Sequence, residues 1–168
     1  EWTTGLHVAN DLFVLLDDPD GAWIGLPEEQ IGAPRTYRGI SNGEDISSDI
    51  DLAFTYRGVN LECLSPVHPS GFRDVSSNLT VTWKRRTRVG GAWRDSVDAQ
   101  LGEAVEAYEV DVMSGATVKR TLNSASPSVI YSATDQIADF GSVQSSITLR
   151  IYQLSSVVGR GYPLETIL

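Results

Sequence analysis

The chain has 168 residues, of which 41% are hydrophobic and 21% are charged, so its composition is that of a globular protein and not of a disordered one. It contains no run of about 20 consecutive apolar residues, which excludes a membrane-spanning helix. The net charge of −9 falls within residues 1–63, which hold twelve acidic residues and three arginines, whereas residues 64–168 hold ten acidic and ten basic residues. The acidic first part argues against binding to nucleic acid. The change in charge predicts a domain boundary after residue 63.

Residues 1–63 are predicted to form a small acidic, β-rich domain. Residues 11–16 are an apolar run typical of a buried strand, and the proline and glycine that follow predict a turn into a second arm at residues 22–25. The acidic residues of this turn lack the ligand spacing of an EF-hand, so we expect a turn and not a calcium site. The sequence TYRG occurs at residues 36–39 and again at residues 55–58, which predicts two neighbouring strands. A domain of this size buries little core alone, so we expect it to depend on neighbouring structure.

Residues 64–168 are predicted to form a β-sandwich built around Trp83. From residue 79 to residue 83 apolar residues alternate with threonines, which is the period of a strand with one buried face. A buried tryptophan needs a second sheet across from it, and residues 108–112 and 147–154 have the same period and are expected to supply that sheet. The fold class predicted for the whole chain is therefore all-β. The expected core residues are Trp83, Tyr108, Val110, Leu149 and Ile151.

The remaining elements of the sandwich follow from prolines and turn residues. Two prolines within residues 64–69 predict an edge strand, because proline removes hydrogen-bond donors from a sheet. Residues 134–141 predict one or two turns of helix that cross between the sheets, with Thr134 as the N-cap and a terminal glycine. A loop is expected at residues 159–161. Further strands are expected at residues 117–122, 128–131 and 162–168.

No grouping of residues in the sequence predicts a catalytic, metal or cofactor site. Cys63 is the only cysteine, and the nearby His68 is followed by proline in an expected strand, so we do not expect a nucleophile. Cys63 is expected to be a small buried side chain near the domain junction. Glu103 and Glu106 could be offered as a carboxylate pair for acid–base catalysis, but no histidine or cysteine supports them. The chain is therefore predicted not to be an enzyme.

A basic run at residues 84–88 is the main candidate for partner binding. It is expected to continue the Trp83 strand into a hairpin that turns at two glycines and returns at residues 92–94. In one interpretation the cations bind an anionic surface polysaccharide or acidic neighbours in an assembly. In the other, which we favour, they face solvent and keep a sheet edge from aggregating. The candidate partner-binding residues are Arg85, Arg86, Arg88, Trp93 and Arg160.

The order of elements in residues 64–168 carries a first resemblance. It has an opening strand with prolines, a tryptophan in the second strand, the sequence YEVDV in the third, and a sixth strand at residues 147–154. In these features it resembles the fibronectin type III fold. It departs from that pattern at Ile147, which stands where a tyrosine corner is usual, and in the long second connection at residues 84–105.

Longer phrases carry a second resemblance. They are WKRRTRVGGAWRD at residues 83–95, LGE and EAYEV within residues 101–110, ADFGS at residues 138–142, RIYQLS and VGRG within residues 150–161, and GLPEE at residues 25–29. Together they resemble the C-terminal region of the large tail-tip protein of gene transfer agents and related siphophages, also called the baseplate megatron and similar to host-specificity J proteins. The resemblance extends from about residue 14 to the end of the chain.

This second resemblance implies a virion component at the distal end of the tail, acting in tail-hub assembly and host-cell attachment. Its implied partners are other tail-tip and hub proteins and a host surface receptor or polysaccharide, with a homotrimer in the intact particle. It implies no catalytic residues and no cofactor, and the chain is then expected to be a piece of a longer polypeptide. The alternative is a carbohydrate-binding or accessory module of a secreted glycoside hydrolase, with Trp93 and Tyr162 as the stacking pair.

Overall fold

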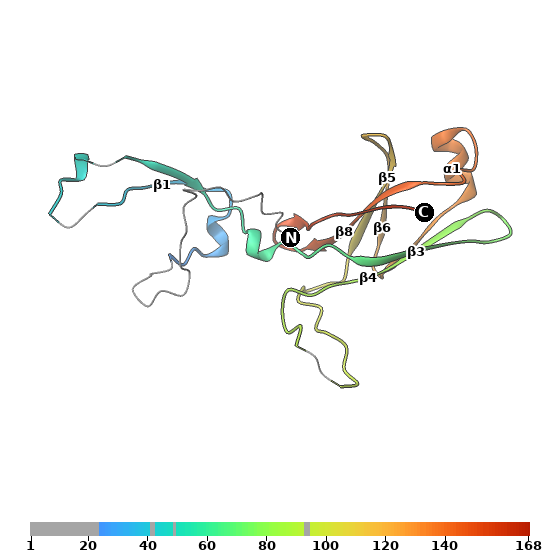
Figure 1. Cartoon of the computed structure of the whole chain (residues 1–168), viewed down its shortest axis with the longest axis horizontal. Coiled ribbons are helices and arrows are strands. Elements are labelled where there is room, and N and C mark those ends of the chain that lie inside the picture. Colours follow the sequence, from blue (N-terminus) through green and yellow to red (C-terminus); the bar gives the residue numbers. More distant parts are fainter. Residues whose placement is uncertain (1–23, 41–42, 49, 93–94) are drawn as a thin grey trace, which may run out of the picture. The chain divides into compact units, whose positions relative to one another are not determined.

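The computed structural model of the chain describes residues 24–40, 43–48, 50–92 and 95–168 (Figure 1). The chain divides into two compact units, one ending at Gly58 and the other formed by Val59–Leu168. The strand predicted at residues 11–16 and the acidic turn after it fall outside the described residues, and residues 24 and 25 of the expected second arm are irregular.

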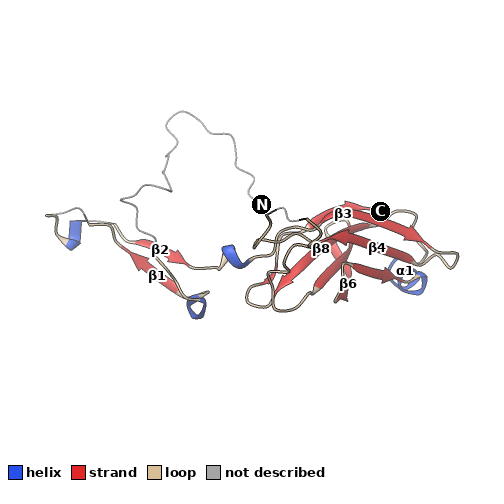
Figure 2. Cartoon of the chain, turned by 90° about the horizontal axis from the view of Figure 1, so that it is seen from below, coloured by secondary structure: helices blue, strands red, loops and turns tan. Residues whose placement is uncertain are grey.

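The first unit is organised by a two-stranded antiparallel sheet of β1 (Pro34–Tyr37) and β2 (Leu52–Thr55) (Figure 2). The two TYRG sequences begin within these strands, so the prediction of two neighbouring strands is confirmed. Tyr37 lies edge-on to Phe54 across the pair, with ring centroids 6.2 Å apart. Short 3-10 helices lie at Glu28–Gln30 (η1) and Ile46–Ser48 (η2).

The second unit is a sandwich of two antiparallel sheets, so the predicted all-β sandwich is confirmed. One sheet has the strand order β3-β4-β7, and the other has the order β10-β8-β5-β6. The loop predicted at residues 159–161 contains a two-residue strand, β9, which pairs with the end of β8. Among the described residues, no helix is long and apolar enough to cross a membrane. The elements are η3 (Val59–Leu61), β3 (Val67–Arg73), β4 (Leu79–Lys84), β5 (Tyr108–Ser114), β6 (Thr117–Ser124), β7 (Ser128–Tyr131), α1 (Ala133–Phe140), β8 (Thr148–Ser155), β9 (Gly159–Arg160) and β10 (Leu164–Ile167).

The core of the sandwich lies between the two sheets and contains Trp83. This side chain is 2% exposed and packs edge-on against Tyr108, with ring centroids 5.1 Å apart. The alternation of β4 buries Leu79 and Val81 on the same side as Trp83. All five residues expected in the core belong to one buried cluster. Strand β5 supplies Tyr108 and Val110 to this cluster, and β8 supplies Leu149 and Ile151.

Strand β3 lies at the edge of its sheet, as the two prolines predicted, but it begins at Val67 and not at residue 64. The register with β4 shifts between Val67 and Ser70. Pro69 lies within this irregularity, where its missing N–H costs no ladder hydrogen bond. The residues just before β3 do not pair in the sheet, and Ser65 is buried there, with its hydroxyl donating to the carbonyl oxygen of Pro163 at 3.0 Å.

Helix α1 connects β7 to β8, as the sequence predicted, but its N-cap is Ser132 and not Thr134. Ser132 has an extended backbone, and its hydroxyl accepts the backbone N–H of Asp135 at 3.0 Å. That bond satisfies one of the free donors of the first helical turn. Gly141 ends the helix with φ at 81°, a left-handed conformation that glycine adopts without a steric penalty.

Candidate functional site

The connection between β4 and β5, residues 85–107, carries most of the candidate binding residues (Figure 1). The predicted hairpin is wrong over the described part of this connection. Strand β4 ends at Lys84, and residues 85–92 and 95–107 are irregular. The physical reason is that two of the arginines bind groups inside the loop instead of continuing the strand.

Arg85, at the start of the loop, binds residues near the end of the loop. Its guanidinium donates to the carbonyl oxygens of Ala99 and Gln100, at 2.5 Å and 3.1 Å, and pairs with Asp98 at 2.8 Å. Asp98 also accepts the backbone N–H of Ala99 at 2.8 Å. These bonds of Arg85 hold the start of the loop against residues 98–100, which lead back toward β5.

A second cluster of side chains, Arg88, Glu103 and Cys63, connects the loop to the chain that leads into β3. Arg88 Nη2 lies 3.0 Å from Glu103 Oε1, and the Glu103 side chain is only 5% exposed. Burial, together with the charge and hydrogen bond of Glu103, raises the pKa of the Cys63 thiol to about 12. A thiol with this pKa stays protonated at neutral pH, so Cys63 is a buried structural donor and not a nucleophile.

The backbone at Cys63 also forms a hydrogen bond with the segment that leads into β10. The carbonyl oxygen of Cys63 accepts the backbone N–H of Tyr162 at 2.9 Å, and the N–H of Gly161 binds the carbonyl oxygen of Gln153 at 2.9 Å. Residues 59–63 therefore pack as part of the sandwich unit. The loop, the entry to β3 and the approach to β10 are all fixed at this one point.

Arg160 lies in a separate cluster on the outer face of the four-stranded sheet. Its guanidinium pairs with Glu109 and with Asp111, the latter at 2.7 Å, and lies over the ring of Tyr152 at 4.5 Å. Asp111 also accepts the hydroxyl of Thr121 at 2.6 Å and is 2% exposed. Burial alone would raise the pKa of Asp111, but the hydrogen bonds from Arg160 and Thr121 outweigh burial and hold that pKa below its ordinary value.

We expect Arg160→Gln to lower the free energy of unfolding at pH 7 by about 1–2 kcal/mol, less than for a fully buried pair because Arg160 is 40% exposed. The folded pKa of Asp111 is lowered, so this stabilisation is present above the ordinary pKa of 3.8 and is lost as the pH falls below it. Urea unfolding at pH 7 and pH 3 should therefore show a difference between wild type and variant that shrinks in acid. Glu165→Gln, which breaks a more exposed pair with Arg150 but leaves the Arg150 charge beside Asp111, is the matched control. A difference that does not change with pH would contradict this assignment.

The two carboxylates that could be offered as an acid–base pair each lie near one of the arginines of the loop: Glu103 binds Arg88, and Glu106 lies 4.0 Å from Arg85. Glu106 also accepts the hydroxyl of Tyr108 at 2.7 Å, so both carboxylates have structural partners. Arg86 is half-buried at the start of the loop. Trp93 lies outside the described residues, so its stacking with Tyr162 is untested.

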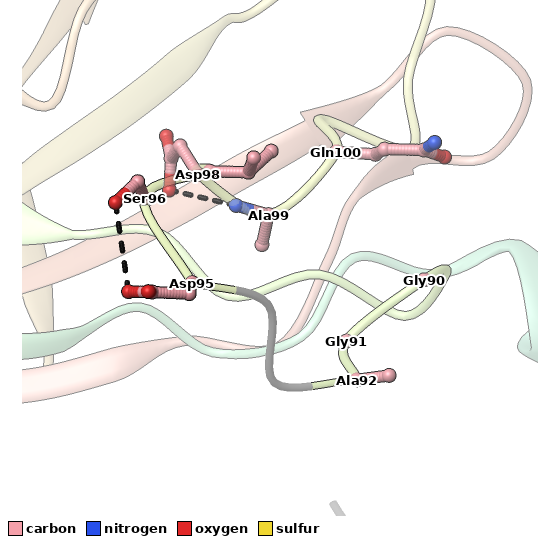
Figure 3. A pocket seen from close by; sticks show the side chains of 9 residues that line it. Gly90, Gly91, Ala92, Asp95, Ser96, Asp98, Ala99 and Gln100 are labelled. Atoms are coloured by element: carbon pink, nitrogen blue, oxygen red, sulfur yellow. Dashed lines mark hydrogen bonds between the residues drawn. The ribbon is translucent and has the colours of Figure 1, made fainter.

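The loop forms an open pocket of about 450 Å³ (Figure 3). Its polar side chains are Asp95, Ser96, Asp98 and Gln100, and two glycines form the opposite wall. Asp98 is already engaged by Arg85. In the part of the chain that the structure describes, no three His, Cys, Asp or Glu side chains are grouped so that they could hold a metal ion. The pocket is an open recess of the loop whose lining is more apolar than polar.

The strand order defines the class of protein to which the sandwich belongs. A three-stranded sheet made of the first, second and fifth strands faces a sheet made of the seventh, sixth, third and fourth strands. Those strands are β3, β4 and β7 in one sheet and β10, β8, β5 and β6 in the other. With the buried tryptophan on the second strand, this is a fibronectin type III-like module.

No family model and no curated protein matches the chain. Among solved structures, it is similar to domains d3–d4 of the rat CD45 extracellular region, with 11% identity, a TM-score of 0.43, and coverage of all of this chain and 80% of that one. It is also similar to the FN5 domain of Drosophila Lar, with 8% identity, a TM-score of 0.37, and coverage of 63% of this chain and 94% of that one. Because both TM-scores are below 0.5, the assignment of the module rests on its own strand order.

Proposed function

We propose that the chain is a structural and attachment module of a phage-like tail tip, acting in tail-hub assembly and in contact with the host cell. The observation that carries this proposal is the set of long phrases, such as WKRRTRVGGAWRD at residues 83–95 and RIYQLS at residues 150–155, that resemble tail-tip proteins of gene transfer agents and siphophages. In this role the chain belongs to the distal end of the tail and works with other hub proteins as part of a homotrimer.

The chemistry of the described side chains supports a role in binding and not in catalysis. The Cys63 thiol is held protonated by burial and by Glu103. Each candidate acid has a structural partner, since Glu103 binds Arg88 and Glu106 binds the Tyr108 hydroxyl. A general acid or base needs a carboxylate that can reach a substrate, and these carboxylates are already occupied.

The braced loop supports a role in assembly. A loop of this length would lose much conformational entropy on binding if it were free. The bonds of Arg85 to the returning limb and of Arg88 to Glu103 order it beforehand. An ordered loop in which Arg85 and Arg88 form internal bonds offers its shape and its backbone groups to a neighbouring subunit. Its contacts would therefore depend less on salt than those of free arginines.

Gold-labelled antibodies against the chain test this proposal on tailed particles from the organism that encodes it. We expect the label at the distal end of the tail in negative-stain electron micrographs, and antibody absorbed beforehand with the purified chain should leave the particles unlabelled. Particles without label would contradict the proposal. Co-purification of the chain with a polysaccharide-cleaving activity instead would favour the glycoside hydrolase module.

A further inference from the structure

The two outer faces of the sandwich differ in charge. On the four-stranded sheet, the outward side chains form ion pairs with one another. Arg150 of β8 pairs with Glu165 of β10 at 2.8 Å, and Arg160 pairs with Glu109 and Asp111 of β5. On such a face the charged groups already have partners. A ligand that binds to these groups would have to break the ion pairs, which costs free energy.

The outer face of the three-stranded sheet has no such pairs. Since Leu79, Val81 and Trp83 of β4 point into the core, Thr80 and Thr82 point outward. The register places two rows of outward residues across the three strands, and neither row, both fully described, contains a charged side chain. The rows are Phe72, Thr80 and Ile130, and Ser70, Thr82 and Ser128.

Two large apolar side chains of this face are open to solvent. Phe72 is 70% exposed and Ile130 is 62% exposed, on either side of Thr80. The four hydroxyl groups of the rows lie around them. Charge is present beyond both rows, at Lys84 in the last position of β4 and at Asp74 directly after β3, where it accepts a hydrogen bond from the Asn78 side chain. The face thus combines one flat aromatic ring with hydroxyl donors and acceptors and excludes charge from its centre.

We infer that this face, defined by the two rows and called here the neutral face, binds an uncharged glycan. Sugar rings carry C–H groups on one face, which pack against an aromatic ring whose face is electron-rich, and their hydroxyls match those of serine and threonine. A charged ligand would find no counter-charge within the rows. The inference deepens the proposed attachment role by naming the chemistry of the partner.

The size of the neutral face also favours a glycan over a second copy of the chain. Strands lie about 4.8 Å apart and alternate residues about 7 Å apart, so the two rows cover on the order of 200 Å² with their margins. A stable protein–protein interface usually needs about 800 Å² on each partner. The neutral face is therefore large enough for a short run of sugar rings and too small to hold a dimer.

Affinity electrophoresis of the whole chain in native gels tests this inference. Dextran, laminarin, galactomannan and hydroxyethyl cellulose serve as neutral probes, each in a separate gel, and dextran sulfate serves as the anionic one. We expect at least one neutral polysaccharide to retard the chain, and Phe72→Ala to weaken that retardation by about tenfold or more. Val75→Ala, a fully exposed residue in the turn after β3 and outside both rows, should bind as wild type does.

Thermal melts of both variants check that they fold, which is expected because both side chains are exposed. Three results would overturn the inference: no retardation by any neutral polysaccharide, retardation by dextran sulfate alone, or equal retardation of Phe72→Ala and wild type. Self-association in sedimentation that Phe72→Ala abolishes would assign the neutral face to a second copy instead. Glycan binding without label on tailed particles would refute the tail-tip role alone, and label without glycan binding would refute this inference alone.

Discussion

Replacing Trp83 by alanine is expected to lower the free energy of unfolding by about 3–5 kcal/mol, which is enough to unfold the sandwich or leave it barely folded. The indole is 2% exposed and lies in one cluster with residues of both sheets, including Val110 and Leu149. Its removal leaves a cavity at the centre of the sandwich, because strands held by their ladders cannot close around the lost volume.

Urea unfolding followed by circular dichroism measures this loss. Trp83→Phe keeps an aromatic ring in the core and should lose clearly less stability than Trp83→Ala. Phe72→Ala removes a large side chain from the same sheet, but from its exposed side, and should change stability little. A Trp83→Ala variant as stable as Phe72→Ala would show that the tryptophan does not organise the core.

Gly161→Ala is expected to destabilise the sandwich by about 3 kcal/mol. A Cβ atom at this position would lie 2.3 Å from the carbonyl oxygen and 2.8 Å from the carbonyl carbon of Cys63. Both are backbone atoms, and the oxygen accepts the backbone N–H of Tyr162, so the carbonyl group cannot move aside without breaking that bond. The methyl group would therefore separate the approach to β10 from the chain that enters β3.

Gly91→Ala is the matched control for this substitution. Gly91 lies in the loop of the same unit, and the nearest atom to a Cβ there is Thr87 Cγ2 at an ordinary contact distance of 3.8 Å. Thermal melts should show a clear fall in melting temperature for Gly161→Ala and almost none for Gly91→Ala. Equal melting temperatures of the two variants would mean that the close approach at Cys63 is relaxed in solution.

The sequence by itself was sufficient for the framework of the sandwich. The two-residue period of residues 79–83, 108–112 and 147–154 identified the strands and the side of each that is buried, because apolar side chains on one face must leave water together. The same period placed Trp83 on the buried side of its strand, where so large a side chain needs a second sheet across from it. Prolines located the edge strand, and the repeated TYRG sequence located the pair β1 and β2. Each of these signals depends only on residues close together in the sequence, so it can be recognised without knowing which strands face each other across the core.

Only the tertiary structure determined which partners the charged and polar side chains bind. Arg88 and Cys63 meet at Glu103 although Cys63 is 40 positions from that residue in the chain, and Arg160 reaches Asp111 from another strand. Periodicity shows which face a residue occupies but not which distant charge it meets there, because the pairing depends on strand order and on the path of the loops. For that reason the basic run looked like an exposed hairpin in the sequence. In the folded chain, Arg85 and Arg88 are instead the braces that hold the loop in shape.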